Sequence, residues 1–152
     1  MERWSGFAEQ APELAAAGEA LLYQHGPGLG YLATLRPDGA PRLHPVCPHV
    51  HDGGLYVFIG HGSPKRTDLL RDGRCSVHTF PADDVDDEFM VAGAARPVDD
   101  DDLYGRVLDV YLAQGTTTTD DTLFELLVDR ALHAAYGPRP SWPPTYARWR
   151  AG

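Results

Sequence analysis

The stretch that most constrains the fold is Leu55–Val77, which reads LYVFIGHGSPKRTDLLRDGRCSV. Its first five residues are apolar, β-branched or aromatic, and they predict a strand. Gly60 and Gly62 then favour a turn, because glycine accepts backbone conformations that other residues avoid. Ser63 suits the N-cap of a helix, and the proline after it suits the first turn. Gly73 is expected to end this helix before a second strand begins.

Two basic residues, Lys65 and Arg66, fall in the first turn of this predicted helix. Cations are unfavourable there for the helix itself, because a helix N-terminus carries positive charge. They are well placed for an anion, since free N–H groups, a serine hydroxyl and two cations converge. Lys65 is also the only lysine among thirteen basic residues. The pattern favours a phosphate site, and a solvated cation on an ordinary surface turn is the alternative.

Composition narrows the classes of function. The 152 residues predict a single domain over 1–152, and the formal net charge is −9. Acidic clusters at 83–88 and 99–102 argue against nucleic acid and anionic membranes as partners. Residues 1–20 lack the pattern of a signal peptide, and no apolar run approaches the roughly 20 residues of a membrane span. Cys47 and Cys75 read as reduced thiols, so a cytoplasmic protein is expected.

The rest of the chain predicts short strands in hairpin order between two helices. The spacing of apolar residues predicts a helix over 7–25 and another over 99–114. Strands are predicted over 30–35, 41–51, 55–59, 74–80 and 88–97. Prolines inside 41–51 indicate an edge strand or one broken by a bulge. Residues 122–135 suit a helix by propensity, and their alternation supports a strand only in part.

These elements predict a mainly β (α+β) fold in which a small antiparallel barrel carries flanking helices. Gly93 is expected to mark a bulge or a close approach of two backbones. The tail, residues 137–152, shows no periodicity. Its aromatic side chains are costly to leave in water, so it is expected to pack on something, a second subunit being one candidate.

Three segments carry a family resemblance: GYLATLRPDGAPRLHPV, the stretch from Leu55 to Phe80, and DEFMVAGAARPV. Together they resemble the pyridoxamine 5′-phosphate oxidase-like family of flavin- and deazaflavin-binding split β-barrels, from about Gly30 to Val98. The resemblance implies a six-stranded antiparallel split barrel with residues 122–135 as the sixth strand. It also implies a homodimer with two FMN sites at the subunit interface.

The resemblance assigns cofactor contacts one residue at a time. Ser63 and Lys65 match positions that hold the flavin phosphate, and Arg66 follows them. Arg42 matches an arginine near the phosphate and the ribityl chain. The strand residues matched along the isoalloxazine ring and the ribityl chain are His44, Pro45, Val46, Phe58 and Ile59. The tail residues that could reach the partner subunit's flavin are Trp142, Arg148 and Trp149.

Two positions depart from the family pattern. Glu88 falls near a position where some members place a glutamine, and Pro64 stands where the enzyme that names the family has an arginine. Pyridoxamine and pyridoxine phosphate are therefore not the expected substrates. The expected function is an FMN-dependent oxidoreductase that passes hydride between the flavin and a small organic substrate. His44 is the candidate for a hydrogen bond to the ring or substrate, and no other catalytic residue is assigned.

Other cofactors stay open. A deazaflavin coenzyme has a longer anionic tail, which would need more cations than Arg36, Arg42, Lys65 and Arg66 supply. A non-enzymatic module that binds flavin or heme is the third alternative. No metal site is expected: His49 and His51 share one strand face, but the spacing of a metal motif is missing and solvent-facing histidines are the simpler interpretation.

Overall fold

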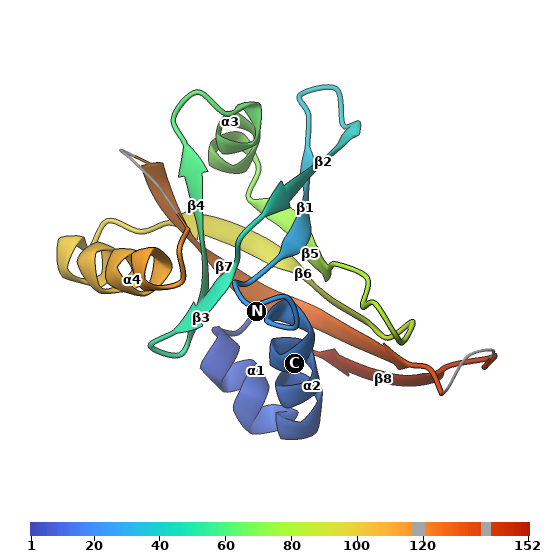
Figure 1. Cartoon of the computed structure of the whole chain (residues 1–152). Coiled ribbons are helices and arrows are strands. Elements are labelled where there is room, and N and C mark those ends of the chain that lie inside the picture. Colours follow the sequence, from blue (N-terminus) through green and yellow to red (C-terminus); the bar gives the residue numbers. More distant parts are fainter. Residues whose placement is uncertain (117–120, 138–140) are drawn as a thin grey trace.

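The computed structural model describes residues 1–116, 121–137 and 141–152. Its main feature is a strongly curled antiparallel sheet with helices at both ends and along one side (Figure 1). This arrangement confirms the predicted mainly β, split-barrel fold with flanking helices. The helices are α1 (Trp4–Gln10), α2 (Pro12–Leu22), α3 (Pro64–Arg71) and α4 (Asp101–Ala113). The strands are β1 (Gly30–Leu35), β2 (Pro41–Val46), β3 (His49–His51), β4 (Gly54–Gly60), β5 (Arg74–Thr79), β6 (Glu88–Pro97), β7 (Asp121–Ala135) and β8 (Thr145–Arg150).

The strand order explains how the sheet closes. Within the described residues the order is β2-β1-β5-β6-β7-β4-β3, and β8 pairs with β7 outside this path. β2 and β3 stand at the two ends of the path, yet only Cys47 and Pro48 separate them in the chain. The chain therefore links both edges of the curled sheet. Pro48 has no N–H to donate to a ladder, so the strand expected over 41–51 breaks here, as its prolines predicted.

Apolar side chains from both halves of the chain fill the barrel. Phe7, Leu32 and Phe124 are fully buried there, and α1 and α2 close one end. β4 is buried on both faces, because Val57 faces the interior whereas Phe58 packs under α4. This two-sided burial accounts for the uninterrupted apolar sequence of β4.

The helices differ from the expected ones mainly at the N-terminus. The prediction of a single helix over 7–25 is wrong. α1 ends at Gln10, Ala11 separates the two helices, and α2 runs from Pro12 to Leu22. Proline cannot continue a preceding helix, but it fits the first position of a new one. The late helix predicted over 99–114 is confirmed as α4. No helix in the described part of the chain is long and apolar enough to cross a membrane.

The C-terminal part contains more strand than expected. Residues 122–135 are confirmed as a strand within β7. The tail shows no periodicity and no strand was expected there, but it contributes β8, which pairs with the second half of β7. Together with the division of the second strand, this gives eight strands in the described residues where six were expected. β8 is exposed along most of its length, so apolar residues do not alternate along it and the usual strand signal is missing.

Gly93 meets the expectation of a bulge or a close approach: the extra residue of the bulge is Asp129 of β7, and Gly93 lies opposite it. The register of β6 against β7 shifts between Ala92 and Gly93. A Cβ on Gly93 would lie 1.9 Å from the carbonyl oxygen of Leu127, so no other residue fits without moving the backbone. The bulge bends both long strands and increases the curl of the sheet.

The other glycines of the central stretch act differently from expectation. α3 ends at Arg71, and Gly73 does not have the positive φ of a helix-ending glycine. A Cβ on Gly73 would instead lie 2.6 Å from the carbonyl oxygen of Ala95, so close packing against β6 requires this glycine. Gly60 and Gly62 also lack a positive φ, so the turn before α3 does not depend on left-handed glycine.

Candidate functional site

The candidate site begins at the N-terminus of α3. The preceding turn is held by backbone hydrogen bonds from Ser63 N to Gly60 O (2.9 Å) and from Arg66 N to Ser63 O (3.0 Å). Ser63 occupies the N-cap position, but its hydroxyl makes no capping bond. That hydroxyl therefore remains available to a ligand placed at the helix start.

The two cations of this turn have different surroundings. Lys65 is half-buried; burial lowers the pKa of its amine, and the charge of Asp121 opposes that shift. Arg66 donates from Nε to the hydroxyl of Thr122, at 2.6 Å, which ties the start of α3 to the start of β7. Lys65 thus contributes a point charge to the turn, while Arg66 also fastens the helix to the barrel.

A second group of predicted residues comes from β2. Arg42, His44 and Val46 alternate along one face of this strand, and Pro45 lies on the opposite, exposed face. Burial lowers the pKa of His44, and the positive charges of Lys65, Arg42 and Arg36 lower it further. The charges of the α3 turn and of the β1–β2 hairpin therefore act on the same imidazole. Figure 1 shows both elements at the same end of the barrel.

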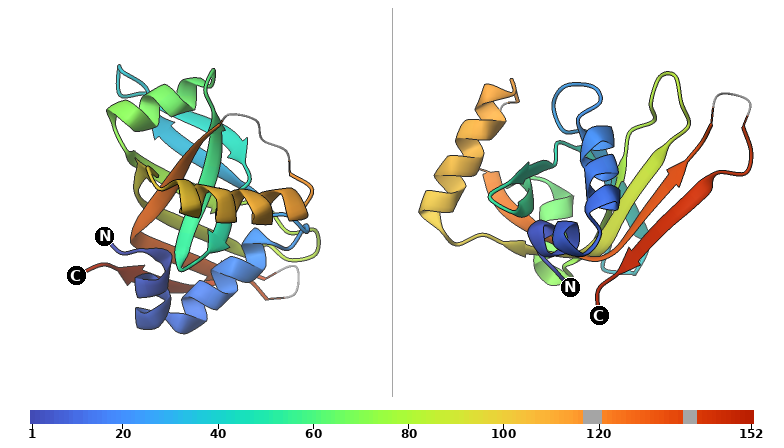
Figure 2. Two further views of the ribbon diagram at one scale, coloured as in Figure 1. Left: turned by 90° about the vertical axis from the view of Figure 1, so that its left-hand side faces the viewer. Right: turned by 90° about the horizontal axis from the view of Figure 1, so that it is seen from below.

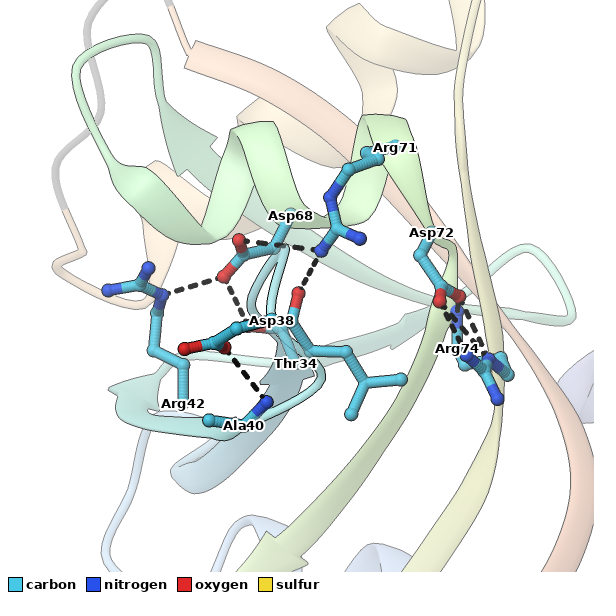
Figure 3. A network of polar contacts seen from close by, with 9 residues as sticks. Thr34, Asp38, Ala40, Arg42, Asp68, Arg71, Asp72 and Arg74 are labelled. Carbon is cyan, nitrogen blue, oxygen red and sulfur yellow. Dashed lines mark hydrogen bonds and ion pairs between the residues drawn. The ribbon is translucent and has the colours of Figure 1, made fainter.

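Asp68 lies at the centre of the polar network under α3 (Figure 3). The residue as a whole is only 2% exposed. Oδ2 accepts hydrogen bonds from Thr34 Oγ1 at 3.0 Å and from Arg42 Nε at 2.6 Å, and Arg71 lies 3.8 Å from Oδ1. Burial alone would raise the pKa of Asp68, but these hydrogen bonds and the charges of both arginines outweigh it and hold the pKa below its usual value.

Sequence reasoning gave Asp68 no role. A carboxylate one turn after two cations is a recognisable signal, but its partners Thr34 and Arg42 are far away in sequence. Only the fold brings them together. Through this network, one buried carboxylate, that of Asp68 on α3, holds Arg42 of β2.

Three predicted ring contacts are buried in this subunit. Val46 and Ile59 belong to the barrel core. Phe58 points to the other side, where its ring lies 5.2 Å from that of Tyr104 and 4.9 Å from that of Tyr111. These side chains fill the protein's own cores, so their role beside a cofactor stays a prediction.

The predicted tail residues lie far from α3 within one subunit (Figures 1 and 2). Trp142 is 78% exposed. The Arg148 guanidinium lies 4.6 Å from the centre of the Tyr146 ring. The ring of Trp149 packs 5.0 Å from that of Phe7, which gives Trp149 a place in the fold of its own subunit. Any contact of this tail with a cofactor near Lys65 would therefore come from a second subunit.

The site thus combines a cationic cluster, an unused hydroxyl and an imidazole that burial and charge keep neutral at pH 7. Such a set can bind a phosphate or carboxylate and can offer one hydrogen bond beside it. Among the described residues, no group of three or more His, Cys, Asp or Glu side chains could hold a metal ion.

Comparison with known proteins agrees with this geometry. Residues 18–135 match the sequence model of the pyridoxamine 5′-phosphate oxidase family. No curated protein was found to match the chain. Solved structures share the fold at low sequence identity, and three of them illustrate the range.

The structure of a heme binding protein from Mycobacterium smegmatis has a TM-score of 0.66 at 23% identity; the match covers 89% of this chain and 57% of that one. This chain therefore spans less than two thirds of that protein. A NimC/NimA family protein from Clostridium acetobutylicum has a TM-score of 0.65 at 15% identity, covering 90% of this chain and 94% of that one. HutZ, the heme storage protein from Vibrio cholerae, has a TM-score of 0.60 at 18% identity, covering 78% and 89%.

Proposed function

The chain belongs to the pyridoxamine 5′-phosphate oxidase family, and from this premise we propose that it is an FMN-dependent oxidoreductase acting on a small organic substrate. The observation that carries the proposal is that the charges of Lys65, Arg42 and Arg36 all act on His44, at the end of the barrel where α3 begins. A flavin phosphate is the kind of anion that this cluster fits.

The protein's part in the proposed reaction is mainly binding and orientation. Bound flavin would supply the hydride chemistry. Lys65 would neutralise the phosphate as a point charge, and the hydroxyl of Ser63 would donate a hydrogen bond to it. His44, neutral at pH 7 because its pKa is lowered, would hydrogen-bond the ring or the substrate without carrying a charge of its own.

A homodimer is part of the proposal, and the outer face of the sheet supports it. Ala33 of β1 pairs with Leu43 of β2 and with Ser76 of β5, and Ser76 pairs with Ala92 of β6, so these residues form one cross-strand row. In the right-hand view of Figure 2, no helix lies on the outer side of β5 and β6. Leu43 is 63% exposed, as expected of a side chain that a second subunit covers.

The shape of this face supports the same conclusion. Three shallow hollows of about 390, 440 and 230 Å³ lie along it. Met90, Ala92 and Ala33 each line one of them. A second copy of the chain that fills these hollows could also bring its tail toward the α3 end of the first subunit, which a single subunit cannot do.

The test is flavin binding, measured by visible absorption and by titration with FMN and with riboflavin. We expect the wild type to bind FMN more tightly than riboflavin, which lacks the phosphate. Lys65→Ala should weaken FMN binding roughly ten- to a hundredfold, the loss of one charge-assisted contact, and should leave riboflavin binding unchanged. Arg106→Ala is the matched control, because Arg106 pairs with Asp52 on α4's side of the barrel and lies outside the cluster.

Two results would contradict the proposal. One is a protein that retains no flavin under any condition. The other is a Lys65→Ala variant that keeps the full preference for FMN over riboflavin, since the phosphate would then be held elsewhere.

Heme binding is the second candidate, and a particular feature of His44 favours it. A neutral imidazole is the form that ligates heme iron, and the cations around His44 could pair with the propionates. Two of the similar structures are those of a heme binding and a heme storage protein. A sharp heme band after addition of hemin, with no flavin retained, would favour this reading. A deazaflavin coenzyme is less well supported, because its longer anionic tail would need further cations.

A further inference from the structure

We propose that Asp68 is a positioning residue that presents the outer edge of the Arg42 guanidinium to the anionic group of the cofactor. The inference rests on the proposed function, because it concerns the same site. It assigns a role to a buried carboxylate that never touches the ligand.

The geometry between Asp68 and Arg42 is specific. Arg42 contacts Asp68 through Nε, at 2.6 Å, and in Figure 3 the only contact drawn between the two side chains starts from Nε, not from a terminal nitrogen. The Arg42 side chain is 20% exposed and that of Asp68 is 4% exposed. The arginine is therefore held through Nε by a buried group, and its outer edge, formed by the two terminal nitrogens, makes no described hydrogen bond to that group.

The chemistry of guanidinium makes this orientation useful. Arginine carries five N–H donors in one rigid plane. A contact through Nε leaves the two terminal nitrogens as a fork, and such a fork matches the oxygens of a phosphate or carboxylate. If Asp68 bound the terminal nitrogens instead, the fork would be consumed inside the protein.

Two elements, β1 and α3, fix the carboxylate in turn. Thr34 of β1 donates its hydroxyl to Oδ2 at 3.0 Å, and Asp68 itself belongs to α3. On the other oxygen, Arg71 lies 3.8 Å away and also donates to the carbonyl oxygen of Leu35. The carboxylate cannot turn without breaking one of these contacts, so the direction of Arg42 is set by β1 and α3 as well as by β2.

A negative charge beside an anion site has an electrostatic cost, which makes the inference testable. By charge alone, removing the carboxylate should strengthen anion binding, because the site becomes more positive by one unit. By positioning, removing it should weaken binding, because a free arginine on an edge strand loses a fixed orientation and must be ordered by the ligand. The two explanations predict opposite signs.

The experiment measures the affinity of the full chain for FMN and, separately, for inorganic pyrophosphate by calorimetry. We expect Asp68→Asn to weaken both by about tenfold, the loss of one charge-assisted contact. Thr34→Val, which removes only the second hydrogen bond to the carboxylate, should weaken both by a smaller factor. Asp38→Asn is the charge control, because Asp38 lies on the β1–β2 hairpin that carries Arg42. The only described contact of its carboxylate is a hydrogen bond from Ala40 N, so the substitution should leave affinity equal or slightly higher.

A double-mutant cycle separates positioning from a general structural role. In an Arg42→Ala background, Asp68→Asn should cause no further loss of affinity, because its effect passes through Arg42. If the loss persists in that background, Asp68 acts through the fold at large and the proposal is wrong. Tighter binding by Asp68→Asn in the wild-type background would equally overturn it.

The two probes distinguish this inference from the proposed function. Pyrophosphate binding that depends on Arg42 and Asp68, in a protein that retains no FMN, would support the positioning role and contradict the flavin assignment. FMN binding that is unchanged by Asp68→Asn and Arg42→Ala would do the reverse. A wild type that binds neither probe would overturn both.

Discussion

At the scale of single residues, His49 is the most unusual side chain. It is fully buried, and neither ring nitrogen has a hydrogen-bond partner. Its ring packs 4.4 Å from that of Tyr111 and 6.3 Å from that of Tyr23. A solvent-facing histidine was the simpler expectation at this position, and it is wrong. The strand is short and α4 covers it, which no local pattern indicated.

His49 makes stability depend on pH. Burial lowers its pKa to about 4 in the folded protein, whereas an unfolded histidine titrates near 6.5. The unfolded chain therefore binds a proton that the folded chain refuses, and stability falls as the pH drops from about 6.5 toward 4. Between pH 7.5 and pH 5 this group should remove about 2 kcal/mol from the free energy of unfolding.

The check is urea unfolding of the wild type and of His49→Leu at both pH values. Leucine has a similar volume and leaves no polar atom unpaired, so the variant should be at least as stable at pH 7.5. It should also lose about 2 kcal/mol less than the wild type on going to pH 5. An equal loss in both proteins would mean that His49 takes up its proton while folded.

The residue scale also shows where sequence reasoning succeeds. Lys65 and Ser63 were placed correctly at a helix start because their signals are local: a strand, a turn, a cap and a proline within ten residues. Asp68 and His49 were not understood, because their roles depend on partners such as Thr34 and Tyr111 that are distant in the chain. Local patterns identify what a residue can do, but not what it contacts.

At the scale of elements, two glycines form a natural comparison. Gly93 of β6 lies opposite the bulge at Asp129 of β7, where a Cβ would lie 1.9 Å from the carbonyl oxygen of Leu127. Gly105 sits inside α4, where a Cβ would meet nothing within 4 Å. The same substitution by alanine should therefore have opposite effects at the two positions.

We expect Gly93→Ala to lower the free energy of unfolding by at least about 3 kcal/mol, because two strands must separate to admit a methyl group. Gly105→Ala should raise it by about 0.5–1 kcal/mol, because alanine loses less backbone entropy in a helix. Thermal and urea unfolding of both variants would measure this. Similar values for the two would show that the bulge relaxes easily, against the close contact seen here.

The elements that the sequence predicts are those whose apolar residues follow a clear strand or helix pattern. β4 and α4 are strongly patterned and were expected close to their actual bounds. β7 was ambiguous because its bulge changes the phase of alternation near Asp129, so that part of the strand resembles a helix. β8 gave no signal, because only Trp149 along it reaches the core. The family resemblance identified residues 122–135 as a strand, but it did not predict β8.

At the scale of the whole molecule, the sheet is covered unevenly. α4 lies over the outer side of β4, and α1 and α2 close one end of the barrel. The outer row formed by Ala33, Leu43, Ser76 and Ala92 has no such cover in the described part of the chain. The site at α3 and the tail at β8 lie at opposite ends of one subunit, so pairing of two subunits through this row would explain both features.

Two exposed leucines allow this pairing to be tested. Leu43 lies on the outer row and is 63% exposed, whereas Leu112 lies on α4 and is 49% exposed. Because both face solvent in one subunit, a glutamate at either position should leave the monomer's fold intact. Leu43→Glu should weaken a dimer formed through the outer row at least about tenfold, since each subunit would bury an unpaired charge. Leu112→Glu should leave the dimer unchanged.

Sedimentation velocity over a range of concentrations measures the effect, and FMN retention measured on the same samples links assembly to the site. A wild type that is monomeric throughout, or two variants that dissociate equally, would place the subunit contact elsewhere, and the tail would then have no route to the cofactor.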